Sequence, residues 1–269
     1  MVGPVAEAGI YYAMLRLIAN DPKTQWRSDG SVYELPFSGA RVRVRSHDEA
    51  GKFDLNTVPD TVLINLMENI GLSYEDAAAL VDVIIDWRDS DDFRRVNGAE
   101  EAEYRDAGLD YGPRNKDFQS MQELRLVLGV SRDLYRKLEP MVTVYNGSKG
   151  IDPTKSPREV LYALPGITDN IIETYLEDRA ASADNSLPPP VFPVSVENME
   201  FTNANGTTFS IESEARFPDG RQATISAVIK KSNGDRMPFE FLEWNTRFPG
   251  ENSLFDESVI VVGQTDSDN

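Results

Sequence analysis

The sequence contains no cysteine and a single histidine, His47, among its 269 residues. Without cysteine the chain has no disulfide, no thiolate nucleophile and no cysteine-bound zinc cluster, and disulfide usage gives no indication of the compartment. His47 follows a strand-like run and leads into a polar turn, where a surface imidazole is expected rather than a catalytic base. Because one histidine cannot supply a nucleophile, a base and an orienting group, we do not expect an enzyme.

Positive charge and long hydrophobic runs are also scarce. The chain has 27 Lys and Arg against 45 Asp and Glu, a formal net charge of -18. Nucleic-acid binding by counterion release needs a basic face, so we expect no nucleic-acid partner, and the acidity favours divalent cations instead. No stretch approaches the ~20 apolar residues of a membrane span, and none resembles an intact signal peptide.

What the sequence does contain is a change of hydrophobic period along the chain. Alternation of polar and apolar residues predicts strands, with turn signals at Ser38-Gly39 and Pro218-Asp219-Gly220, over 31–37, 40–45, 207–216, 221–230 and 239–247. Between these two groups the period is helical, with capping residues and glycine stops. The second strand carries Arg41, Arg43 and Arg45 on one face, which we interpret as a solvated face, with an acidic partner as the alternative.

These patterns predict an α+β protein in which an N-terminal helix packs on an antiparallel sheet and a large all-α domain is inserted between strands. The predicted parts are 1–53, the helix and first strands; 54–185, the helical domain; and 186–269, the remaining strands and a polar tail. The prolines at 188–190 mark the second boundary. A weak internal repeat, starting at Leu55 and again at Ile151, predicts paired helical hairpins within the insertion.

The first helix is predicted at 6–19 and has two different faces. Four apolar residues fall on the face expected to pack on the sheet: Ile10, Met14, Leu17 and Ile18. Tyr11, Tyr12 and Leu15 leave further apolar area that a neighbouring helix could cover. The candidate partner-binding residues of this helix are Ile10, Tyr12 and Leu15.

A crowded acidic loop follows a helix predicted at 77–85. Its oxygen-bearing side chains are Asp89, Asp91, Asn97, Glu100 and Glu103. Like charges so close together repel unless a cation lies among them, and calcium, which takes about six to eight oxygen ligands, is the obvious candidate. Counted from Asp89, oxygen donors fall at positions 1, 3, 9 and 12 of an EF-hand loop. Phe93 and Arg94 break that pattern, so the match is to the chemistry and not to the EF-hand fold.

The alternative is a solvated acidic loop without a metal. Its carboxylates would then pair with Arg88, Arg94 and Arg95, which lie in the same stretch. The sequence leaves both interpretations open.

Several segments taken together resemble one protein family. They are Ala6–Gly9, Asp54–Thr57 with Pro59, Asp86–Asp89 with Asp91, Asn97–Glu100 with Tyr104, Arg114–Asn115 with Phe118, Glu123–Val127 with Gly129–Val130, and Pro157 with Glu159–Leu161 and Leu164–Gly166. From the first helix to about residue 180 the chain resembles the minor pseudopilin K family of bacterial type II secretion systems, also called general secretion pathway protein K.

The resemblance implies a pilin-like helix and sheet with a large helical insertion. It further implies a non-enzymatic subunit that caps the tip of a periplasmic pseudopilus with minor pseudopilins I and J and supports the export of folded proteins. It implies calcium in the helical domain, which we map only onto the acidic loop. We expect the leader and the hydrophobic helix that inserts into the inner membrane to be missing from this sequence, and the folded part to lie in the periplasm. An alternative function is a calcium-dependent module that recognises secreted proteins.

Overall fold

The computed structural model describes residues 2–21, 24–185, 187–197, 199–202, 206–232, 238–247, 253–256 and 260–261. The chain divides into two compact units, Met1–Glu49 with Asn205–Asn269, and Ala50–Ala204. The second unit is one continuous stretch between the two segments of the first. The sequence placed these boundaries at 53 and 185.

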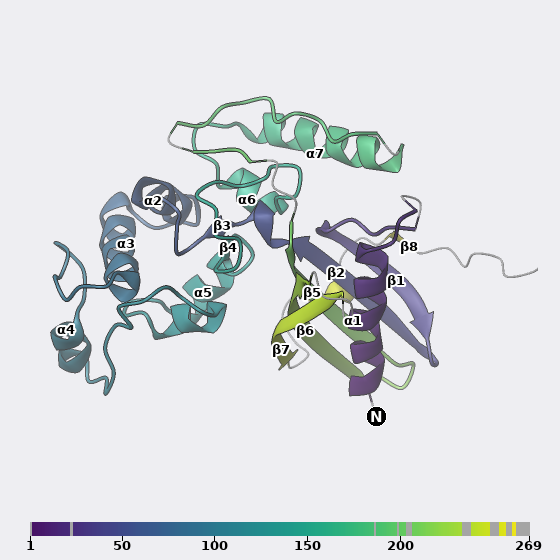
Figure 1. Ribbon diagram of the computed structural model, residues 1–269, viewed down its shortest axis with the longest axis horizontal. Helices are drawn as coiled ribbons and strands as arrows, with labels where there is room; N and C mark the ends of the chain where they lie inside the picture. The colour runs from purple at the N-terminus through teal and green to yellow at the C-terminus, as the bar shows by residue number, and fades with distance from the viewer. Residues whose placement is uncertain are drawn as a thin grey trace, which may run out of the picture. The chain divides into compact units, whose positions relative to one another are not determined.

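The first unit consists of one helix on one sheet. Helix α1 (Gly3–Leu17) lies across the sheet, as Figure 1 shows. The strands, in the spatial order β7-β6-β5-β2-β1-β8, are β7 (Phe239–Arg247), β6 (Gln222–Lys231), β5 (Thr208–Arg216), β2 (Ala40–Asp48), β1 (Asp29–Phe37) and β8 (Ile260–Val261). All neighbours are antiparallel except β8, which runs parallel to β1. The predicted strands and the Ser38-Gly39 turn, with φ of 51° and 77°, are confirmed.

The apolar faces of α1 and the sheet meet closely. Because side chains alternate along a strand, Val42 and Val44 of β2 point into the core beneath α1 and the intervening arginines point to the other face. Gly9 is the point of closest approach, since an added Cβ would clash with Ser213 and Val42. Ile18 lies beyond the helix and is 38% exposed, so its predicted place in the core is wrong. The helix ends at Leu17, and Ile18 no longer follows its period.

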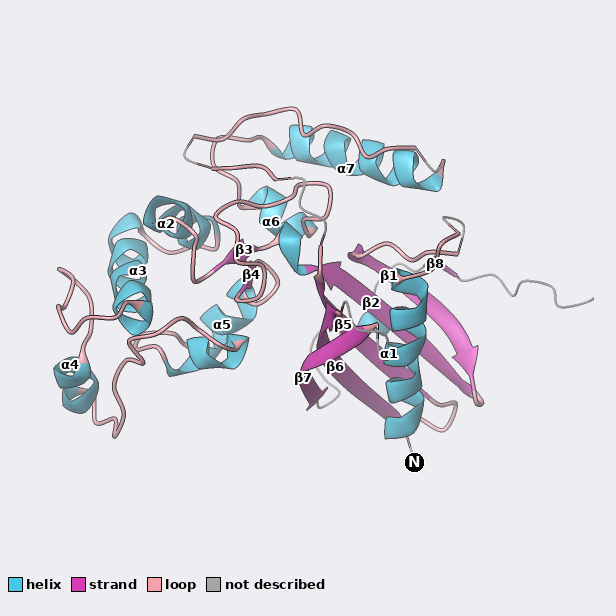
Figure 2. Ribbon diagram, in the orientation of Figure 1, coloured by secondary structure: helices cyan, strands magenta, loops and turns pink. Residues whose placement is uncertain are grey.

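The second unit is mainly helical, with two short parallel strands, as Figure 2 shows. Its elements are the 3-10 helix η1 (Glu49–Gly51, which begins in the first unit), β3 (Phe53–Asp54), α2 (Asp60–Asn69), α3 (Tyr74–Arg88), α4 (Glu101–Asp106), the 3-10 helix η2 (Met121–Leu126), α5 (Arg132–Leu138), β4 (Val142–Thr143), α6 (Arg158–Tyr162) and α7 (Asp169–Asp184). Ser120 precedes η2 and makes no side-chain cap. One hydrophobic core runs from Phe53 to Val196.

Two helix pairs in this unit are built alike. Gly71, at a φ of 104°, separates α2 from α3, and Gly166, at 73°, separates α6 from α7. These left-handed conformations favour glycine. A proline, Pro59 or Pro157, precedes the first helix of each pair. Thr57, two residues before Pro59, donates its hydroxyl to the Ser148 carbonyl.

The chain continues to pack on the helical unit beyond the predicted boundary at 185. Phe192 stacks edge-on against Tyr175 of α7, with ring centroids 4.8 Å apart, and meets Phe201 at 5.2 Å. Phe201 in turn forms a parallel bridge with Ile151. These aromatic contacts keep the residues after the prolines in the second unit.

Candidate functional site

The acidic loop is held between two buried aromatic residues. Trp87, near the end of α3, and Tyr104 of α4 lie with ring centroids 6.0 Å apart, and Trp87 also stacks on Phe118 at 6.2 Å. All three rings are almost fully buried. The loop of residues 89–100 is therefore anchored to the core at both ends, by Trp87 before it and by Tyr104 after it.

Asp86 organises the inside of the loop. It is fully buried and its carboxylate accepts hydrogen bonds from the backbone N–H of Arg95, 3.1 Å from Oδ2. Burial raises its pKa. Gly98 passes so close that an added Cβ would clash with this carboxylate, which explains the glycine at that position.

Glu100 lies beside this carboxylate in a strongly negative environment. It is 9% exposed, and burial, followed by the negative charges of Asp86, Asp89, Asp92 and Asp91, raises its pKa to about 7. Burial and the charge of Asp91 also raise the pKa of Asp89. The charged forms of these carboxyls are therefore disfavoured when no cation is present.

Three buried oxygens at this place have no hydrogen-bond donor among the described residues. They are Asp89 Oδ1, Glu100 Oε1 and Asn115 Oδ1. Asn115 comes from the loop after α4, and its Nδ2 donates to Asp92 Oδ1 at 2.8 Å. Buried acceptors normally have partners, and hard oxygen ligands of this kind suit calcium. This donor set fits an oxygen-preferring divalent cation.

Two of the predicted ligands are engaged elsewhere. Asn97 donates from its backbone N–H and from Nδ2 to Asp82, at 3.1 and 3.4 Å. Glu103 accepts from the backbone N–H of Glu100 at 2.9 Å and pairs with Arg94 at 2.7 Å. The first of these contacts lowers the pKa of Glu103 and forms the capping box of α4.

The structure thus brings together Asp89, Asp91 and Glu100 from the predicted set, and adds Asp86, Asp92 and Asn115. Asp86 and Asp92 are adjacent in sequence to the predicted ligands, so acidity alone could have included them. Asn115 is distant in sequence, and only the fold places it beside Asp92.

The arginines of this stretch bind groups other than Asp89, Asp91 and Glu100. Arg95 pairs with Asp60 and Asp82, both at 2.7 Å, and Arg94 pairs with Glu103. Arg88 turns to the Val58 carbonyl at 3.4 Å. Within the described ranges, no ion pair joins these arginines to Asp89, Asp91 or Glu100. The alternative of a self-neutralised loop therefore accounts for Glu103 and not for Asp89, Asp91 or Glu100.

The inner carboxylates are neighbours but are not gathered on one point. In the part of the chain that the structure describes, no three Asp, Glu, His or Cys side chains converge as metal ligands do. A calcium cage here would need small side-chain movements and contributions from amide or backbone oxygens, which calcium sites commonly use. Phe93 and Val96, 82% and 88% exposed, project from the same loop.

The predicted partner-binding residues of α1 have different environments. Ile10 is fully buried against the sheet, so it is not available to a partner. Tyr12 is half-buried, with its ring 5.5 Å from that of Trp26. Leu15 is 64% exposed and Tyr11, one turn before it, is 46% exposed. The accessible apolar face of α1 is therefore formed by Tyr11 and Leu15.

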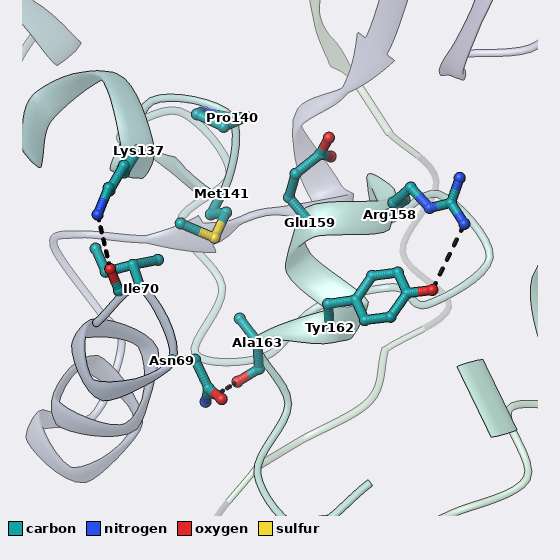
Figure 3. A pocket seen from close by; sticks show the side chains of 9 residues that line it. All are labelled: Asn69, Ile70, Lys137, Pro140, Met141, Arg158, Glu159, Tyr162 and Ala163. Carbon is teal, nitrogen blue, oxygen red and sulfur yellow. Dashed lines mark hydrogen bonds between the residues drawn. The ribbon is translucent and has the colours of Figure 1, made fainter. Parts of the chain in front are cut away.

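A cavity of about 500 Å³ lies in the helical unit, and none of the predicted site residues lines it (Figure 3). Ile70, Met141 and Ala163 give it an apolar lining, and Lys137 lies at its rim, where its ammonium donates to the Ile70 carbonyl at 2.9 Å. Arg158 on the other side hydrogen-bonds Tyr162. These contacts are structural, and none of the lining residues forms a catalytic arrangement.

Comparisons with known proteins all lead to one family. The model of the family described as Type II secretion system (T2SS), protein K matches residues 47–147. The type II secretion system protein K of Pseudomonas aeruginosa is 28% identical over 224 residues, which cover 78% of this chain and 66% of the relative. That of Pectobacterium carotovorum is 34% identical over 132 residues, 44% of this chain and 40% of the relative. The chain spans less than two thirds of the length of these curated relatives.

A solved structure shares the fold. A chain in the crystal structure of the GspK-GspI-GspJ complex from the enterotoxigenic Escherichia coli type 2 secretion system matches with a TM-score of 0.63 and 18% identity. The match covers 91% of this chain and 94% of that chain. The expected mixture of a helix-covered antiparallel sheet with further helices is confirmed, as is the resemblance to protein K.

The raised pKa of Glu100 predicts how stability depends on pH without divalent cations. Between about pH 4.5 and about pH 7 the folded chain retains a proton that the unfolded chain has released. The free energy of unfolding therefore falls as the pH rises through this window. In chelator, the melting temperature of the wild type should fall from pH 5 to pH 7.5 relative to Glu100→Gln, which has no such proton to lose.

The exposed neighbour Glu101, paired with Arg105, provides the control. Glu101→Gln should show the same pH dependence as the wild type. Parallel melting curves for the wild type and Glu100→Gln would contradict the prediction.

Proposed function

Since this chain is a relative of type II secretion system protein K, we propose that it is a minor pseudopilin that assembles with minor pseudopilins I and J. Its role in this proposal is structural. The observation that carries the proposal is α1, which covers one face of the sheet in a fold shared over most of the chain with a component of the GspK-GspI-GspJ complex. Tyr11 and Leu15 leave an apolar strip on the outer side of that helix.

This strip continues onto the sheet. Tyr11 lies edge-on to Phe241 of β7, with ring centroids 5.9 Å apart, and 6.3 Å from Trp244, which is itself 39% exposed. Helices associate when apolar strips of this kind are covered. The partner-facing surface in this proposal is therefore Tyr11 and Leu15 with the exposed edge of Trp244.

Leu15→Glu should weaken binding to the I and J subunits by at least about tenfold, because a carboxylate would be buried in an apolar interface. Its melting temperature should stay close to that of the wild type, since Leu15 is 64% exposed. Titration calorimetry against the two partners and a thermal melt measure both effects.

Leu187→Glu is the matched control, because Leu187 is 60% exposed and lies in the helical unit. It should bind the partners normally. Equal affinity of Leu15→Glu and the wild type would exclude this face of α1 as the interface.

The second part of the proposal is that the subunit caps the tip of the pseudopilus. Pilin-type subunits stack along a helical fibre, so a large inserted body in every subunit would collide with the subunit above. The helical unit, Ala50–Ala204, has its own core and is larger than the strand connections of the first unit. Such bulk is tolerated only where no subunit follows. Inner-membrane attachment through a preceding segment, a periplasmic location and support of protein export belong to this proposal.

None of the helices in the described ranges is long and apolar enough to cross a bilayer.

Replacing Ala50–Ala204 by a short Gly-Ser linker tests the tip assignment. Asp48 and Phe209 are paired residues on antiparallel β2 and β5, so their Cα atoms lie within roughly 5.5 Å and a hairpin-length linker reaches. The shortened chain should still bind I and J, because α1 and the sheet are retained. It should no longer limit pseudopilus growth, which electron microscopy of cells measures. Pseudopili of ordinary length with normal secretion would exclude steric capping.

We also propose that calcium occupies the acidic loop. The proposed ligands are Asp89 and Glu100, with Asp91, Asp92 and Asn115 close by. When bound, the ion would supply a positive charge beside these carboxylates, which form no ion pair among the described residues. It would also fix residues 89–100 between Trp87 and Tyr104. The unpartnered oxygens of Asp89, Glu100 and Asn115 support this assignment.

Calcium should bind with a dissociation constant between about micromolar and millimolar, measured by titration calorimetry. Asp89→Asn combined with Glu100→Gln should remove the binding, because both proposed charges are lost. Asn97→Ser should retain it, since Asn97 contacts Asp82 instead. The absence of binding heat, together with a melting temperature that chelator does not change, would rule out the site.

A further inference from the structure

The face of the sheet opposite α1 is lined by charged residues in a fixed pattern. On β2, Arg41 and Arg43 alternate with the valines beneath α1. On the neighbouring strand β5, Arg216 lies opposite Arg41 and Glu214 lies opposite Arg43 in the strand register, so the charged pattern continues. Glu34 of β1 pairs with Arg41 and Arg43, at 2.7 and 2.6 Å. The sequence alone predicts a solvated face here, whereas the structure places a segment of the chain on it.

That segment is Ser253–Asp256, which includes the 3-10 helix η3 (Leu254–Asp256). The backbone N–H of Leu254 donates to Glu214 at 2.8 Å, and its carbonyl accepts from Arg43 at 2.9 Å. Glu214 is 3% exposed and Leu254 is fully buried. Both backbone groups of one residue are thus recognised by charged side chains of two strands.

The aromatic ring of Phe255 lies among three guanidinium groups. The Cζ atoms of Arg216, Arg43 and Arg41 are 4.3, 4.6 and 5.2 Å from its centroid. Cations within about 6 Å of an aromatic ring are attracted by its negative face. Three such contacts to one ring make this position selective for an aromatic side chain.

Ser253 completes the recognition. Its hydroxyl lies 2.9 Å from Glu214 and 2.9 Å from Arg216 Nη2. The sheet therefore contacts a hydroxyl at position 253, a buried aliphatic residue at 254 and an aromatic ring at 255. Asp256 follows these three residues. Short linear segments are recognised by other proteins through the same combination of backbone hydrogen bonds and side-chain pockets.

We propose that this face is a recognition site for a short segment of the type Ser-Leu-aromatic in a 3-10 turn, which the chain's own Ser253–Phe255 fills in cis and a segment of the same chemistry fills in trans. The segment is separable because β2 and β5 already have hydrogen-bonded neighbours on both sides without it. Among the described residues, the hydrogen bonds and cation–π contacts of this segment to β2 and β5 come from Ser253, Leu254 and Phe255, and so small a set of contacts favours local opening. The proposal is independent of the proposed function.

A fluorescent peptide with the sequence of residues 251–258 tests the site by anisotropy on the 269-residue chain. A tethered occupant competes at an effective concentration of about a millimolar, so Phe255→Ala should bind the peptide at least about tenfold more tightly than the wild type. Adding Arg43→Ala should abolish that binding. Phe93→Ala, which removes an exposed ring elsewhere, should behave as the wild type, and a peptide with alanine in place of its phenylalanine should not bind.

A measurement on the wild type covers the case in which Phe255→Ala loses stability. Millimolar peptide should accelerate amide hydrogen exchange at Leu254, whose N–H is released when the segment is displaced. Unchanged exchange at Leu254, or a folded Phe255→Ala chain that does not bind the peptide, would overturn the proposal.

The source of a segment in trans is distinguished by sedimentation. Concentration-dependent dimers of the wild type that Phe255→Ala lacks identify a second copy as the donor. A wild type that stays monomeric while it binds the peptide excludes a second copy as the donor.

Discussion

The pairing of β2 with β5 is the constraint on which the molecule depends. Asp48 and Phe209 are register partners although the whole helical unit lies between them in sequence. Closing so long a connection is entropically costly, and the ladder, the core beneath α1 and the charged face above it all stabilise it together. This one pairing therefore joins the two segments of the first unit into a sheet. It also brings together the two points of the chain between which the second unit is inserted.

That same pairing produces two faces with different chemistry. Toward α1, Val42 of β2 and Ser213 of β5 lie so close to the helix that only glycine fits at position 9. On the other face, Arg43 and Glu214 meet the Leu254 backbone. Since side chains alternate along a strand, a shift of register by one residue would exchange the two faces and destroy both.

The acidic loop shows a different balance, in which burial opposes charge. Arg94 pairs with Glu103 and Arg95 pairs with Asp82 of α3, while Glu100 lies in the negative field of Asp86 and Asp89. The solvated-loop interpretation accounts for Glu103, while calcium at Asp89 and Glu100 stays a prediction. A carboxyl whose pKa is raised to about 7 is a site with unbalanced charge, which is where functional groups are commonly found.

The sequence by itself determined the strands, the Ser38-Gly39 turn and the presence of an acidic loop with oxygen chemistry, because periodicity, turn conformation and composition are local properties. The tertiary structure decided that Asn97 faces Asp82, that Asn115 joins the loop, that Ile10 is buried and that Phe255 lies among three arginines. Most of these contacts join residues that are far apart in sequence, and no local pattern predicts such a contact. The burial of Ile10 depends on which side of α1 the sheet covers. Only the packed chain settles them, since burial and long-range neighbours set the direction and the charge environment of every side chain.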